Sequence, residues 1–155
     1  MTEARRTQRL GAYAVAYRTD ADGADLLLVT RISPVGYPAG YWTLAGGGVD
    51  HGESPHDAVR RELHEETGLT ALSAQLVDVH DVHVVERGRN DGYEDYHGVH
   101  LLFRTVVDDS VEPHVVEVGG STDVACWVRV DEIGTTYQPI LPMLQHVLDH
   151  RERFR

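Results

Sequence analysis

Three glutamates near the end of one predicted helix are the residues whose types and spacing point most clearly to chemistry. Glu62, Glu65 and Glu66 occur in the stretch RRELHEETGL, and on a helix of about 100° per residue they span an arc of only about 100°. Carboxylates this close repel one another, and the carboxyl end of a helix disfavours each of them by about 0.3–1 kcal/mol. Since locally unfavourable choices tend to mark functional sites, the cluster predicts a cation site; a solvated acidic face is the alternative.

A run of three glycines precedes this helix and adds a second reason to expect a cation. Gly46, Gly47 and Gly48 are predicted to form a loop whose backbone can approach a ligand closely, and a carbonyl oxygen there could join the carboxylates. Such an oxygen-rich set suits Mg²⁺ or Mn²⁺, not zinc. The run is neither a P-loop nor a dinucleotide fingerprint, because no Gly-Lys-Ser/Thr follows and the glycine spacing differs.

The elements that must position these groups are a helix and a set of strands. The helix is expected at 54–67, with Ser54 as its N-cap, Asp57 completing a variant capping box and Gly68 closing its end. The side chains expected to face a sheet are Val59, Leu63 and Thr67. Strand-like patterns occur at 10–18, 26–32, 41–44, 72–86, 97–107 and 123–130, with loops at 33–40 and 87–96. A C-terminal helical pattern covers 139–154, so the order predicts a mixed sheet flanked by helices in a single α/β domain of residues 1–155.

Composition narrows the classes of function. The chain has 155 residues, 41% of them hydrophobic, which suits one globular domain, and its net charge of −11 argues against binding nucleic acid or an anionic membrane. A polyanionic substrate would therefore need a divalent cation. No apolar run reaches the length of a membrane helix and no signal peptide is evident, so a soluble, cytoplasmic protein is expected. The single cysteine, Cys126, lies in an apolar strand-like run and is expected to be a buried structural thiol.

From Gly47 to Leu69 the sequence resembles the Nudix box, G-x5-E-x7-R-E-U-x-E-E-x-G-U, where U is a bulky aliphatic residue. Nine specified positions match: Gly47, Glu53, Arg61, Glu62, Leu63, Glu65, Glu66, Gly68 and Leu69. The preceding WTLAGGGVDHGE is similar to the approach to that box, with Ala45 where proline is usual and Asp50 where glutamate is usual.

This resemblance implies an α/β/α sandwich that hydrolyses a nucleoside diphosphate linked to another group X, with nucleoside triphosphates or ADP-ribose first among the substrates. It assigns Mg²⁺, with Mn²⁺ as a substitute, to the carboxylates of Glu62, Glu65 and Glu66 and the carbonyl of Gly46. It pairs Arg61 with Glu53, which would fix the glycine segment against the helix. A homodimer is plausible on the same ground.

The general base and the substrate contacts are less constrained. Glu65 is the favoured base, and Asp123, Glu94 and Asp95 are the alternatives, each also explicable as an ordinary exposed acid. Two residues are candidate substrate contacts. They are Gly47, through its backbone, and Arg31, which would touch a phosphate unless it forms a surface ion pair instead.

Two further readings stay open. The first is a non-catalytic Nudix domain that senses a nucleotide, although the box is whole and no DNA-binding domain is attached. The second is another metal site among histidines at strand-like intervals, His80, His83, His97 and His100, whose spacing and carboxylate partners are not compelling.

Overall fold

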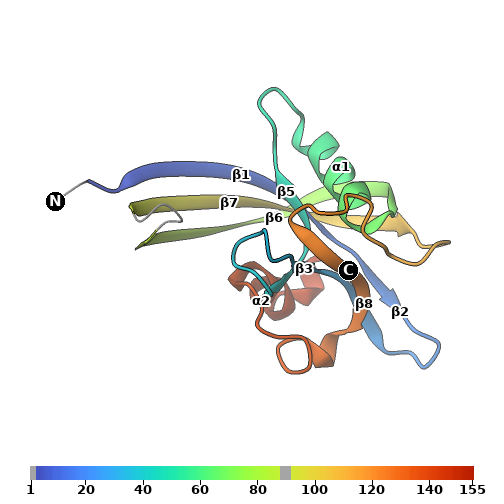
Figure 1. Cartoon of the computed structure of the whole chain (residues 1–155). Helices are drawn as coiled ribbons and strands as arrows, with labels where there is room; N and C mark the ends of the chain where they lie inside the picture. The colour runs from blue at the N-terminus through green and yellow to red at the C-terminus, as the bar shows by residue number, and fades with distance from the viewer. Residues whose placement is uncertain (1–2, 88–91) are drawn as a thin grey trace.

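The computed structural model describes residues 3–87 and 92–155, and it has the mixed α/β architecture that the sequence predicts (Figure 1). Its strands are β1 (Arg5–Val15), β2 (Tyr17–Thr19), β3 (Asp25–Ile32), β4 (Trp42–Thr43), β5 (Ala45–Gly48), β6 (Thr70–Arg87), β7 (Tyr93–Asp108) and β8 (Thr122–Arg129). Its helices are α1 (Pro55–Thr67) and α2 (Pro142–Asp149), with short 3₁₀ turns at Val130–Glu132 and Arg151–Arg153. Neither α-helix has the length and the apolar character that crossing a bilayer requires, within the described residues.

The strands form two sheets. The first has the order β5-β1-β7-β6, in which β1 and β7 run parallel and the other neighbours run antiparallel. The second is built on β3, which pairs along most of its length with β8, and with β2 and β4 near its two ends. α1 and α2 lie on opposite sides of the strands, giving three layers (Figure 1).

Two buried apolar clusters form the core, one beneath each helix. β1 contributes to both, because successive side chains of a strand point to opposite faces. Ala12 and Ala14 join the cluster under α1, and Val15 joins the cluster under α2. Leu63 of α1 and Leu144 of α2 are fully buried in these clusters, and each side chain of this kind contributes about 1.5–3 kcal/mol of burial free energy.

The outer parts of β1, β6 and β7 project beyond the core as a three-stranded arm, formed by residues 5–10, 79–87 and 93–99 (Figure 1). β5 pairs with β1 only at Gly11–Ala14, so the arm's part of β1 has β7 as its partner. The loop predicted at 87–96 is therefore wrong at Arg87 and at 93–96, which belong to strands, while 88–91 lie outside the described residues.

Other boundaries also differ from the predictions. The three glycines form strand β5 and not a loop, because β1 supplies their partner strand. Ser54 precedes α1 with extended backbone, but its side chain makes no capping hydrogen bond, so the predicted capping box is wrong. The C-terminal helix begins only at Pro142, because backbone hydrogen bonds to Trp42 hold the preceding residues extended. Cys126 on β8 is half-buried and not fully buried, and this burial raises the pKa of its thiol.

Candidate active site

The acidic edge of α1 is positioned by the apolar side of the same helix. Val59, Leu63 and Thr67 are buried against the strands, as the helical pattern predicts. The helix ends at Gly68, whose φ of 71° is left-handed and whose N–H donates to the carbonyl oxygen of His64. With one face fixed in the core, the neighbouring edge faces β5 and the start of β8.

Glu66 is the most buried acid of this edge, with only 8% of its surface exposed. The Gly46 N–H donates to one carboxylate oxygen over 2.9 Å, and the Thr122 hydroxyl donates to the other over 2.9 Å. The pKa of Glu66 is raised to about 8, mainly by burial; Glu62 and Glu65 act in the same direction, and the two hydrogen bonds act against it. A bound cation would stabilise the ionised form of a carboxylate held so far from water.

Glu62 lies directly against the backbone of β5. A Cβ atom on Gly47 would come within 2.8 Å of the Glu62 carboxylate carbon, so a larger residue there would displace this acid. Burial also raises the pKa of Glu62, opposed by Arg61. Gly47 thus helps to position the Glu62 side chain. The contact of Gly47 with substrate stays a prediction.

Arg61 connects α1 to β5 and to Glu53 through hydrogen bonds. Its guanidinium donates to both carboxylate oxygens of Glu53 at 2.8 and 2.9 Å, and these bonds lower the pKa of Glu53 to about 2. The same guanidinium donates to Glu62 at 3.0 Å, to Glu65 at 3.3 Å and to the Gly48 carbonyl at 3.2 Å. The Arg61–Glu53 pair implied by the resemblance is therefore present, and it fixes β5 against α1.

The acids surround a small cavity of about 20 Å³, lined by Glu62, Glu65, Glu66, Val115, Glu117, Ser121 and Thr122. Sequence reasoning did not find Glu117, whose segment has no regular secondary structure to predict. Backbone N–H groups of Val116 and Glu117 donate to the Glu65 carbonyl, which brings this segment to the end of α1. No local signal in the sequence indicates that contact.

The donor set of this cavity fits a small hard cation. Its charged groups are all carboxylates, and about 20 Å³ is room for one water-sized sphere. In the described part of the chain, no three His, Cys, Asp or Glu side chains already share a metal-ligand geometry. Arg61 accounts for this, because it draws Glu62 and Glu65 onto one of its own nitrogens. Binding of a cation thus requires these two acids to turn from Arg61 toward Glu66.

Gly46 contacts the acids through its backbone. It is opposite Tyr13 in the antiparallel pair, and its N–H points away from β1 toward Glu66. Its φ of 154° departs from regular strand geometry, and the role of its carbonyl as a cation ligand stays a prediction. The neighbouring Ala45, where the box approach usually has proline, is the first residue of β5 and is buried opposite Ala14.

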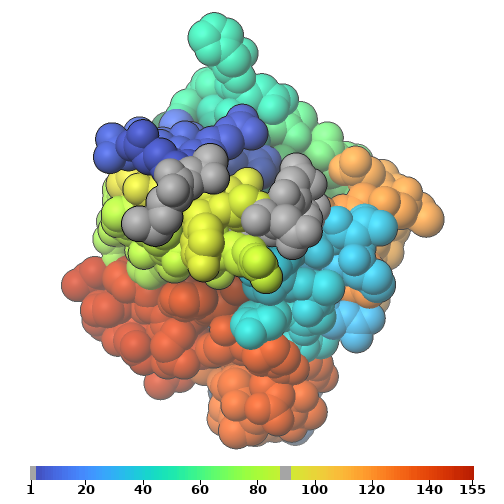
Figure 2. Space-filling view, turned by 60° about the vertical axis from the view of Figure 1, so that its left-hand side comes forward, coloured from blue at the N-terminus to red at the C-terminus, as the bar shows by residue number. Residues whose placement is uncertain are grey.

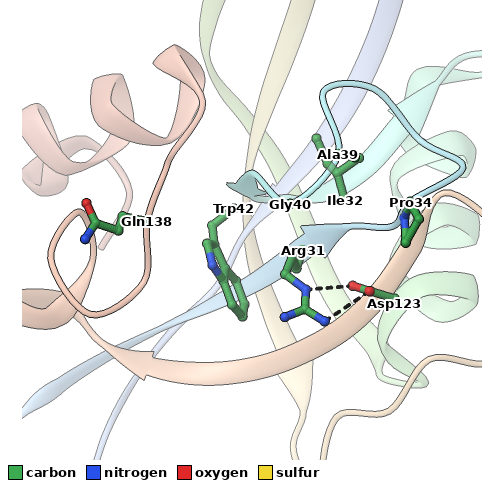
Figure 3. Close-up of a pocket in the computed structure, with 8 residues that line it drawn as sticks. All are labelled: Arg31, Ile32, Pro34, Ala39, Gly40, Trp42, Asp123 and Gln138. Atoms are coloured by element: carbon green, nitrogen blue, oxygen red, sulfur yellow. Dashed lines mark hydrogen bonds and ion pairs between the residues drawn. The ribbon is translucent and has the colours of Figure 1, made fainter.

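Arg31 and the alternative bases lie outside the small cavity. Arg31 makes a bidentate ion pair with Asp123 at 2.9 and 3.0 Å, so the surface ion pair foreseen as the alternative is what the structure has. Both side chains line an open cavity of about 430 Å³ next to Trp42 (Figure 3). Asp95 is on the arm, 2.5 Å from His83, and Glu94 precedes it on β7.

The histidines form pairs and not a metal centre. His80 and His100 have Nδ1 atoms 3.1 Å apart, and His97 contacts Asp81 at 2.8 Å on the opposite face of the arm. Burial lowers the pKa of His100 to about 4, with His80 adding to the effect. A metal site among His80, His83, His97 and His100 is absent from the described residues.

Comparisons with known proteins agree with this geometry. The NUDIX domain model matches residues 8–148. An RNA pyrophosphohydrolase of Acidiphilium cryptum (strain JF-5) is 43% identical over 68 residues, which is 40% of this chain and 42% of that protein. A second, from Bartonella bacilliformis, is 53% identical over 32 residues, 21% of this chain and 19% of the relative. The chain thus matches less than half the length of these curated relatives.

Solved structures extend the likeness over the whole fold. A MutT NUDIX hydrolase from Burkholderia pseudomallei has a TM-score of 0.63 and 28% identity, covering 92% of this chain and 97% of that one. The NUDIX domain of Shewanella oneidensis NrtR, solved with ADP ribose, has a TM-score of 0.65 and 21% identity over 96% of this chain and 90% of that one. The family match spans most of the sequence and its box coincides with the acid cavity, so the chain belongs to the NUDIX family.

Proposed function

We propose that this protein is a divalent-metal-dependent pyrophosphohydrolase that cleaves a nucleoside diphosphate linked to another group X. The observation that carries the proposal is the buried carboxylate of Glu66, placed with Glu62 and Glu65 around a cavity of one-ion size beside the glycine strand. Such a cluster is costly in a protein that has no cation to place there.

Glu62, Glu65 and Glu66, with the Gly46 carbonyl, are the groups that would hold Mg²⁺ or Mn²⁺. The bound cation would neutralise phosphate charge and lower the pKa of water, which allows attack on phosphorus near neutral pH. Arg61 keeps the acidic edge and β5 in register through Glu53 and the Gly48 carbonyl. The protein's own part is to hold Glu66 and Gly46 in place, while Glu62 and Glu65 turn from Arg61 to the cation when it binds.

Glu65 is our proposed general base. Both oxygens of Glu66 accept hydrogen bonds, and both oxygens of Asp123 are engaged by Arg31. Among the described residues, the Glu65 carboxylate has one hydrogen-bond donor, Arg61 at 3.3 Å, and 35% of the side chain is exposed. Its carboxylate can accept a proton from water while the water oxygen bonds to phosphorus and the bridging oxygen leaves with the second phosphate.

A substrate panel tests the proposal. The protein with Mg²⁺ would be incubated with nucleoside triphosphates, ADP-ribose, a dinucleoside polyphosphate and an RNA with a 5′-triphosphate, and products would be identified by mass spectrometry. The RNA belongs in the panel because of the named relatives, although the net charge of −11 argues against it. We expect cleavage of a phosphoanhydride bond that is lost with EDTA and in a Glu65→Gln/Glu66→Gln double variant. Equal turnover by that variant would refute the proposal.

A nucleotide sensor is the second candidate, favoured by the similarity to a NUDIX domain solved with ADP ribose. It predicts tight nucleotide binding without products in the same panel.

A further inference from the structure

Two aromatic rings and a guanidinium lie on the face of the first sheet opposite α1, across β5 from the acids. Arg9 and Tyr13 are on the same face of β1, because they are four positions apart along the strand. Tyr96 of β7 pairs with Thr7, which puts it on that face as well. We call this set, Arg9, Tyr13 and Tyr96, the platform.

The arm lies beside the segment after β3. Figure 2 looks onto the arm, with blue β1 and yellow-green β6 and β7 in front and the cyan segment beside them. The Tyr37 hydroxyl in that segment donates to Glu86 of β6 over 3.2 Å.

Each member of the platform lies close over a glycine. A Cβ atom would come within 2.6 Å of the Tyr13 ring if placed on Gly11, 2.7 Å of the Arg9 guanidinium on Gly48, and 3.0 Å of the Tyr96 ring on Gly98. Glycine weakens a strand interior, and it commonly marks a place where another group must approach the backbone. Here three strand glycines allow two rings and a guanidinium to lie low on the sheet. Arg9 is exposed and Tyr96 is half-buried, whereas the Tyr13 ring packs edge-on against His100 and against the core.

The platform adjoins the acids of the site. Tyr13 pairs with Gly46, and a Cβ atom on Gly46 would come within 2.5 Å of the Tyr13 ring, while the Gly46 N–H donates to Glu66. Gly48 provides a second link. Arg61 donates to its carbonyl oxygen, and Arg9 covers it from the face of the sheet.

Arg9 also has positive charge that no acid uses. No carboxylate among residues 3–87 and 92–155 forms an ion pair with its guanidinium. Arg6, three residues earlier on the opposite face, is 3.9 Å from Asp95. In a chain with a net charge of −11, an arginine that lies over Gly48 with no ion pair among the described residues is suited to an incoming anion.

We propose that the platform binds the nucleotide half of the substrate, with Arg9 on phosphate oxygens and the Tyr96 ring stacked on the base. This inference rests on the proposed function, and it makes the site selective for phosphate chains that carry a nucleobase over those that do not. Arg9 supplies a charge-assisted contact common to both, whereas Tyr96 contributes only when a flat ring is present.

Binding of two ligands tests the inference without turnover. Calorimetry with Mg²⁺ would compare an α,β-methylene nucleoside triphosphate with inorganic tripolyphosphate. Arg9→Ala should weaken both by about tenfold or more. Tyr96→Ala should weaken only the nucleotide analogue, by about tenfold, and Tyr96→Phe should restore it because the ring is kept.

Matched controls lie on the opposite face of the same strands. Arg6→Ala on β1 and Tyr93→Ala on β7 should leave both affinities unchanged. Wild-type affinity in Arg9→Ala and Tyr96→Ala, or equal losses in the controls, would overturn the inference. Should either alanine variant fail to fold, Arg9→Gln and Tyr96→Leu take its place with the same expected losses.

The outcomes separate this inference from the proposed function. Analogue binding that is insensitive to the platform, together with hydrolysis of a natural nucleotide, removes the inference alone. Platform-dependent binding without hydrolysis of any nucleotide removes the proposed function alone.

Discussion

Glu66→Gln removes the charge of the most buried acid in the site and keeps its shape. The glutamine oxygen can still accept the Gly46 N–H, and the Thr122 hydroxyl can turn to accept from the new amide. Burial places the pKa of Glu66 at about 8, against an ordinary 4.5. At about 1.4 kcal/mol for each pH unit, ionising this acid costs roughly 5 kcal/mol more in the folded chain than in the unfolded one.

The direction of the pH effect on stability follows from which state, folded or unfolded, binds the proton more tightly. A carboxyl with a raised folded-state pKa contributes its stability fully below about pH 4.5, and that stability is lost as the pH rises through about 8. Glutamine does not ionise, so the variant loses no stability from this cause over this pH range. Without metal, the free energy of unfolding of Glu66→Gln minus that of the wild type should therefore rise by several kcal/mol between pH 5 and pH 9.

Urea unfolding in EDTA at pH 5, 7 and 9 measures this difference. Adding Mg²⁺ at pH 8 provides the control: the wild type should gain stability and the variant should gain little. Turnover of the variant should fall by at least about a hundredfold, because a ligand of the cation is lost. A stability difference that does not change with pH would show that Glu66 ionises freely, and the burial argument would be wrong.

Three further predictions concern the same site. Saturation with Mg²⁺ at about 100 times its Kd should raise the Tm of the wild type by about 5–10 °C, seen by calorimetric scanning, and a Tm unaffected by Mg²⁺ would contradict cation binding. Gly47→Ala should lower kcat/KM about tenfold or more, because its Cβ would lie 2.8 Å from the Glu62 carboxylate carbon, whereas Gly92→Ala, in open space, should have no effect. Arg61→Lys and Glu53→Gln should each reduce kcat/KM, and the double variant should be little worse than either, since both break one bidentate pair; additive losses would show separate roles.

The central helix and its acids could be predicted because their signals are local. Pro55 and Gly68 mark the ends of α1, and the apolar spacing of Val59 and Leu63 sets which side is buried. The positions of Glu62, Glu65 and Glu66 then follow from helix geometry alone. The different degrees of burial of these three acids do not follow from helix geometry, because Glu66 is covered by the start of β8, a segment distant in sequence.

The elements that were mispredicted depend on partners far along the chain. Gly46–Gly48 has little strand propensity, and it becomes a strand because β1 pairs with it. The turn-like residues of the predicted loop at 87–96 conceal strand residues from Tyr93 onward, which pair with β6 and, from Glu94, in parallel with β1. Glu117 and Arg9 reach the site through tertiary contacts of the same kind.

The most direct test of the account is a count of bound Mn²⁺ by electron paramagnetic resonance. The wild-type protein should bind Mn²⁺, in competition with Mg²⁺. A Glu62→Gln/Glu65→Gln/Glu66→Gln variant that stays folded should bind none at the same concentration. Undiminished Mn²⁺ binding by that variant would place the cation elsewhere and contradict the role given to these three acids.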